Sequence, residues 1–185
     1  MRLKTTREKR ILYFKTTLRI FLYGLIVMAG FIYMTCGTWT KAVVLVPTAV
    51  CVALNADVLV SAFVGAFCGF LIDIACERLF GYNAVLLAVF CAAISLVYEL
   101  YFRKRFFNYL WITALAAFLQ CRLDYEFYYK MWNYENVERI FHTMTLKVWG
   151  YTMISAVIIY IIFAVINKFL MPKAHLTIED VIKTS

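Results

Sequence analysis

The sequence predicts an all-α fold, a polytopic membrane bundle of six transmembrane helices. Of its 185 residues 64% are hydrophobic and only 16% are charged, whereas about a quarter of a soluble domain is charged. Several apolar runs approach the length of about 20 residues that a helix needs to cross the hydrocarbon core. The chain length suits one compact membrane domain with little left for a soluble module.

Six apolar segments are expected to be the spans, because turn-forming or charged residues separate them. Asn55-Ala56-Asp57 is the shortest of these connections. Pro47 is expected to kink the second span, which neighbouring helices tolerate in a bilayer. The predicted spans are residues 19–34, 41–54, 58–74, 82–102, 106–119 and 146–170.

Basic residues gather in the segments that are expected to lie inside. The first nineteen residues carry seven Lys or Arg against one acid, which predicts a cytoplasmic N-terminus. Arg103, Lys104 and Arg105 end the fourth span, so they are expected to mark the inner face and to contact lipid headgroups. With six spans both termini are cytoplasmic. The expected divisions are a basic segment 1–18, a membrane domain 19–171 and a cytoplasmic tail 172–185.

Residues 120–147 differ from the spans in composition. They hold four charges of each sign interleaved with seven aromatic residues. Balanced charge with dense aromatics predicts an outer interfacial segment at headgroup depth. It is interpreted mainly as an anchor, and a partner-binding face is the alternative because exposed aromatic clusters are typical of interfaces.

The most distinctive pattern is a row of small residues that ends in an acid. Gly65, Gly69 and Asp73 follow at four-residue steps and therefore share one helix face. One interpretation is a groove that docks a partner helix, with Asp73 accepting a hydrogen bond. The other is ordinary packing within the chain, with Asp73 solvated near the interface. Gly81 begins the turn before the fourth span, whose start Asn83 is expected to cap.

Other chemistry is not indicated by the sequence. The six cysteines are scattered, and His142 and His175 are isolated, which argues against a metal site. No catalytic or cofactor motif is present, so neither an enzyme nor a cofactor is expected. The surplus of Lys and Arg is local to the membrane-flanking segments, so nucleic acid is not expected as a partner.

The stretch GAFCGFLIDIACERLFGY, residues 65–82, resembles the rod shape-determining protein MreD family. Proteins of that family carry a similar run of glycines ending in an acid, followed by a short loop with a glycine before the next span. The matching positions here are Gly65, Gly69, Asp73 and Gly81. Chain length, short spans, cytoplasmic termini and the lack of catalytic motifs also agree with the family.

The resemblance implies a non-enzymatic subunit of the bacterial cell-elongation machinery in the inner membrane. Its partners would be an MreC-like protein, MreB, and RodA with a class B penicillin-binding protein. The resemblance also implies a six-helix fold that resembles the S-component fold of energy-coupling-factor transporters. In this interpretation Asp73→Leu or Gly69→Leu weakens complex formation and leaves membrane insertion intact. The alternative function is an S-type substrate-binding component of a vitamin or small-molecule transporter, which would need an enclosed polar pocket among the spans.

Overall fold

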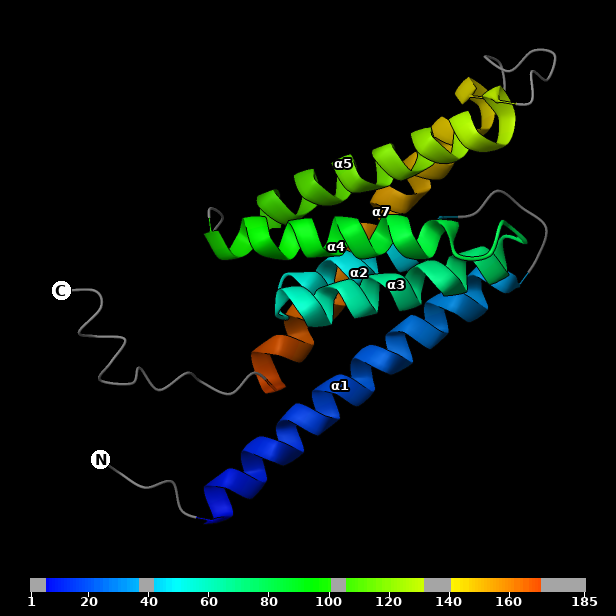
Figure 1. The fold of residues 1–185 in the computed structure, drawn as a ribbon. Coiled ribbons are helices and arrows are strands. Elements are labelled where there is room, and N and C mark those ends of the chain that lie inside the picture. Colours follow the sequence, from blue (N-terminus) through cyan, green and yellow to red (C-terminus); the bar gives the residue numbers. More distant parts are fainter. Residues whose placement is uncertain (1–5, 37–41, 101–105, 132–140, 171–185) are drawn as a thin grey trace.

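A computed structural model describes residues 6–36, 42–100, 106–131 and 141–170 (Figure 1). All the regular structure within these ranges is helical. The helices are α1 (Thr6–Thr35), α2 (Leu45–Ala53), α3 (Val58–Ala75), α4 (Tyr82–Leu100), α5 (Phe106–Tyr125) and α7 (Leu146–Leu170), with π-helical turns η1 (Glu126–Lys130) and η2 (Phe141–Thr145).

Five of the described helices are long and apolar enough to cross a membrane. These candidate spans are Tyr13–Thr35 within α1, then α3, α4, α5 together with η1, and η2 together with α7. The chain runs back and forth through the bundle, so that α1 starts and α7 ends on the same side (Figure 1). A multi-pass helical membrane protein is therefore the architecture, as the composition predicted.

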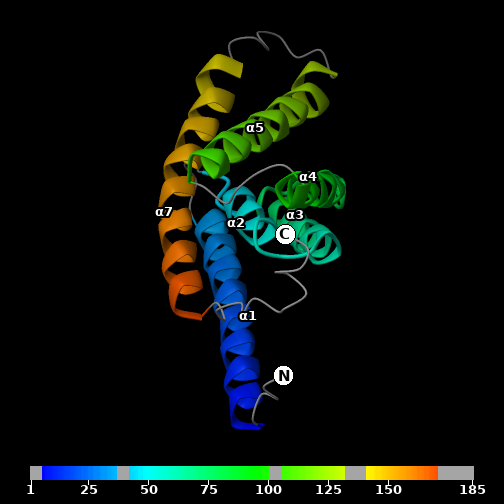
Figure 2. The ribbon, with the colours of Figure 1, turned by 90° about the vertical axis from the view of Figure 1, so that its left-hand side faces the viewer.

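The short helix α2 lies at the centre of the bundle and accounts for the difference from the six spans predicted. Its nine residues are all buried, and at 1.5 Å per residue they extend about 14 Å, half the thickness of the hydrocarbon core. The other helices surround it, with α7, α1 and the α3–α4 pair on different sides (Figure 2). The prediction of a sixth membrane-crossing helix over 41–54 is not confirmed.

Pro47 does not kink a helix, contrary to the prediction. It is the third residue of α2, where a backbone N–H would have no partner within the helix. The entry to α2 is held instead by the backbone N–H of Val43, which donates to the hydroxyl of Thr152 on α7 at 3.0 Å. Proline is therefore compatible with the start of this helix.

Polar side chains inside the bundle donate hydrogen bonds between helices. The Tyr109 hydroxyl on α5 donates to the carbonyl of Ala156 on α7 at 3.2 Å, and the Trp149 indole donates to the carbonyl of Ala114 at 3.2 Å. The Tyr23 hydroxyl on α1 donates to Asn167 on α7 at 2.5 Å. Lipid supplies no competing partners, so such bonds orient the helices.

Helical structure extends beyond two of the predicted spans. The helix α1 begins at Thr6, so it includes part of the basic segment 1–18. The described parts of 120–147 are helical and continue α5 and α7, and their position at headgroup depth stays a prediction. Arg103, Lys104 and Arg105, and the predicted tail 172–185, lie outside the described residues.

Candidate functional site

The two glycines of the motif face α4 of the same chain. A Cβ atom at Gly69 would lie 2.3 Å from the carbonyl oxygen of Asn83 and 2.4 Å from Cα of Ala84. A Cβ atom at Gly65 would lie 2.6 Å from the carbonyl oxygen of Leu87. Only glycine allows the two backbones to approach so closely. This face of α3 is therefore occupied by packing within the chain.

Asp73 caps the start of α4 from the end of α3. One carboxylate oxygen accepts from the backbone N–H of Gly81 at 2.9 Å. The other accepts from the backbone N–H of Asn83 at 3.2 Å and from its side-chain amide at 2.8 Å. The residue is 1% exposed. A carboxylate at a helix N-terminus satisfies orphan N–H groups and interacts favourably with the helix dipole, so Asp73 joins the two helices electrostatically.

The loop between α3 and α4 adopts the conformation that this cap requires. Gly81 has φ of +97°, a value that a glycine tolerates without steric cost. Its N–H points to Asp73, and its carbonyl accepts from Val85 at 3.1 Å in the first turn of α4. Glycine at position 81 thus serves the turn that the sequence predicted.

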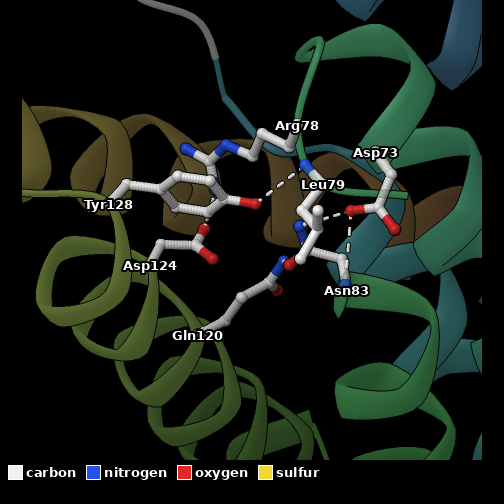
Figure 3. A network of polar contacts seen from close by, with 7 residues as sticks. All are labelled: Asp73, Arg78, Leu79, Asn83, Gln120, Asp124 and Tyr128. Atoms are coloured by element: carbon white, nitrogen blue, oxygen red, sulfur yellow. Dashed lines mark hydrogen bonds and ion pairs between the residues drawn. The ribbon is translucent and has the colours of Figure 1, made fainter. Parts of the chain in front are cut away.

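Asn83 extends the polar contacts to α5. Its side-chain oxygen accepts from the amide of Gln120 at 2.9 Å, so Asp73, Asn83 and Gln120 form a buried chain across three helices (Figure 3). All three side chains are at most 2% exposed. Buried polar groups linked in this way specify one arrangement of the helices.

An ion pair closes the same end of the bundle. Arg78 in the α3–α4 loop pairs with Asp124 on α5, and its guanidinium lies 5.1 Å from the centre of the Tyr128 ring. The Tyr128 hydroxyl accepts from the backbone N–H of Leu79 at 3.0 Å (Figure 3). Burial lowers the pKa of Arg78, but Asp124 outweighs it and holds that pKa above its usual value. The guanidinium therefore stays charged while it holds the loop against α5 and η1.

Two buried acceptors of this network have no hydrogen-bond partner, namely one oxygen of Gln120 and one of Asp124. They are one turn apart on α5, so they lie on the same helix face. No group of three or more metal-ligating side chains occurs among the described residues. The arrangement of polar groups positions the helices relative to one another.

The structure brings together the four residues that the sequence predicted as partner-binding. Gly65, Gly69, Asp73 and Gly81 form one contact between α3 and α4, which agrees with the alternative of packing within the chain. Asp73 is buried, so the expectation that solvent surrounds it is wrong. Arg103, Lys104 and Arg105 lie outside the described residues, and their predicted inner-face role stays a prediction.

Three contributors to this site were missed in the sequence. These residues are Arg78 in the α3–α4 loop and Gln120 and Asp124 on α5. The two partners of the ion pair, Arg78 and Asp124, are 46 residues apart in the sequence, and no local pattern links them. The available signal was the four-residue spacing of Gln120 and Asp124 at the end of an apolar helix, where polar groups require partners.

Fold and site together define a multi-pass helical membrane protein with an internally locked α3–α4 hairpin. No family model, curated protein or solved structure matches the chain.

Proposed function

We propose that the chain is a non-enzymatic inner-membrane subunit of the cell-elongation machinery, which holds partner membrane proteins in the plane of the bilayer. The proposal rests on the resemblance of residues 65–82 to the MreD family. The residues that carry this resemblance act as one unit here, since the glycines seat α4 and Asp73 caps it.

The packing of the bundle centre favours a scaffold over the transporter alternative. All nine residues of α2 are buried among the surrounding helices, and Cys68, Leu87 and Cys91 beside it are 0% exposed. Side chains therefore occupy most of the space where an S-type component would need an enclosed chamber. The cavity beside Cys51 and Phe163 is about 160 Å³, smaller than the range of about 300–1,000 Å³ for small-ligand sites. This is the observation that carries the choice between the two functions.

A partner helix would have to contact the outside of the bundle, because the glycine face of α3 is covered by α4. The lipid-facing surface offers large apolar side chains on every long helix. In a bilayer, helix association depends on close packing and on hydrogen bonds between helices. We therefore expect a partner helix to dock on the outer surface of the bundle and not on the glycine face of α3.

Photo-cross-linking in living cells tests this function and locates the contact. A photoreactive amino acid replaces one exposed residue per helix, with the buried Leu87 as an internal control. The exposed positions are Met28, Phe63, Val89, Trp111 and Ile158. The proposal is supported if positions on one or two neighbouring helices of this protein form adducts with an MreC-like protein or another elongation subunit. No adduct should form from position 87.

Two outcomes would contradict the proposal. Depletion of the protein should turn rod-shaped host cells into spheres, and unaltered rods would argue strongly against a role in elongation. A specific vitamin that raises the melting temperature of the purified protein would favour the S-type alternative, because a ligand that binds only the native state stabilises it by mass action.

A further inference from the structure

A lateral groove of about 570 Å³ separates α1 from α3. Ile20 and Val27 line it from α1, while Val60, Val64 and Phe67 line it from α3. Ile20, Val60 and Phe67 are each at least half exposed. Figure 1 shows α1 diverging from α3 toward the N-terminal end of α1. The exposed side chains that line the groove place its opening on the lateral surface of the bundle.

The groove is polar at one end and apolar along the rest. Arg19 and the Asn55–Asp57 turn line the end where α3 begins. From Arg19 to Val27 the wall of α1 rises about 12 Å at 1.5 Å per residue. A ligand that fits this groove therefore has a charged head and a hydrocarbon body.

Arg19 has unused capacity to bind an anion. Its Nε atom is buried and has no hydrogen-bond partner, and the ion pairs among the described residues are Arg78–Asp124 and Arg122–Glu126. Its guanidinium lies 6.0 Å from the centre of the Tyr23 ring. A guanidinium with free N–H groups at the edge of a bilayer is suited to a phosphate.

Gly24 keeps the floor of the groove open. A Cβ atom there would have nothing within 4 Å, in contrast to Gly65 and Gly69. Glycine inside a helix is less favourable than alanine, and here no contact within the chain requires a glycine. The glycine therefore leaves room for an occupant of the groove.

We propose that this groove binds one phospholipid, with its phosphate on Arg19 and an acyl chain along Val64 and Phe67. Asp57, which lines the same polar end and makes no side-chain cap hydrogen bond to α3, receives the ammonium group of the head. A headgroup with both charges is phosphatidylethanolamine, which the groove binds in preference to phosphatidylglycerol. The volume lies within the range of about 300–1,000 Å³ for small-ligand sites and is too small for a partner helix.

Native mass spectrometry of the full chain in detergent tests the proposal, with equal amounts of phosphatidylethanolamine and phosphatidylglycerol added. The wild type should retain one phosphatidylethanolamine with at least a tenfold preference. Gly24→Leu fills the groove and should lose the bound lipid, whereas Gly150→Leu, at a glycine on α7 that also has nothing within 4 Å, should retain it.

Charge variants provide a second readout that does not alter the shape of the groove. Arg19→Gln should lower phospholipid retention at least fivefold, and Lys15→Gln on the exposed part of α1 should leave it unchanged. Asp57→Asn should shift the preference toward phosphatidylglycerol. If Gly24→Leu lowers the melting temperature, the comparison of Arg19→Gln with Lys15→Gln decides.

Equal retention by Arg19→Gln and Lys15→Gln, or equal binding of both lipids by the wild type, would overturn the proposal and leave only non-specific annular lipid. Loss of a co-purified membrane protein from Gly24→Leu without loss of lipid would identify a partner helix as the occupant and also overturn it. The lipid measurements do not depend on whether the protein belongs to the elongation machinery, since they are made on the purified chain and require no elongation partner.

Discussion

Gly69→Ala is the smallest change that tests the close contact between α3 and α4. The added Cβ would lie 2.3 Å from the Asn83 carbonyl oxygen and 2.4 Å from Cα of Ala84, about 1 Å closer than the 3.4 Å at which ordinary contact begins. Both neighbours are backbone atoms, so no side chain can rotate away. The helices themselves must separate.

Three effects determine how much stability Gly69→Ala loses: overpacking, the higher helix propensity of alanine, and the hydrogen bonds to Asp73. Overpacking of this kind costs about 1–3 kcal/mol, and alanine returns about 1 kcal/mol as the better helix former. Separation also stretches the hydrogen bonds from Gly81 and Asn83 to Asp73, and a buried acceptor that loses its donors costs about 1–3 kcal/mol. We expect a net loss of about 2–4 kcal/mol in the free energy of unfolding.

Unfolding of the purified protein by SDS in mixed micelles, followed by circular dichroism, measures this loss. The matched control is Gly150→Ala, where nothing lies within 4 Å of the new Cβ and stability should stay equal or rise. Gly65→Ala should fall between them, because one of its three close neighbours is a backbone atom and the other two belong to the Cys91 side chain. If Gly69→Ala and Gly150→Ala are equally stable, the assigned contact is incorrect.

Three further predictions follow from the polar end of the bundle and from the topology. Asp73→Ala removes the acceptor of three hydrogen bonds and should destabilise the fold by about 2–4 kcal/mol in the same SDS assay. If the loss of stability is no larger than that caused by substitution of an exposed residue, Asp73 does not cap α4. Arg78→Gln and Asp124→Asn should show a coupling energy of about 1–3 kcal/mol in a double-mutant cycle, and simple additivity would mean that the pair contributes nothing. A membrane-impermeant maleimide should label the exposed Cys36 in intact spheroplasts, while Glu99→Cys, at the opposite end of the bundle, should react only after permeabilisation; the reverse pattern would invert the proposed orientation.

Local patterns were sufficient to predict two of the helices well. The predicted spans 58–74 and 82–102 correspond closely to the helices α3 (Val58–Ala75) and α4 (Tyr82–Leu100). Short polar connections bound both segments on at least one side, and each segment is apolar along most of its length. Within such a hairpin the glycine spacing also predicts a close contact, although spacing alone does not say which helix makes it.

The second span illustrates what hydropathy does not determine. Residues 41–54 are as apolar as a membrane-crossing segment, yet the helix over this region has nine residues. Burial at the centre of a membrane bundle and exposure to lipid both favour apolar residues, so composition does not distinguish them. The position of Pro47 in the first turn depends on where that helix begins, which tertiary contacts such as Val43 with Thr152 help to set.

Only part of the polar network could be predicted from the sequence, for a related reason. Asp73 was identified because an acid on a glycine-lined membrane helix is expensive and needs a partner. Its donors are nearby in sequence, at Gly81 and Asn83. The link from Asn83 to Gln120 and the ion pair of Arg78 with Asp124 join residues far apart in the chain, so they depend on how α5 packs.

Disulfide formation between Gly65→Cys and the native Cys91 is the most direct test of whether the glycine face of α3 is an internal contact. A Cβ at position 65 would lie 2.9 Å from the Cβ of Cys91 and 2.6 Å from the backbone oxygen of Leu87. The two helices must therefore separate slightly, which brings the Cβ atoms toward the spacing of about 3.5–4.5 Å that a disulfide needs. Mild oxidation in membranes should link the two positions within one chain, detected by mass spectrometry of the denatured tryptic digest. Cross-links from position 65 to a different protein, with none to Cys91, would show that α3 presents this face to a partner and would contradict the account.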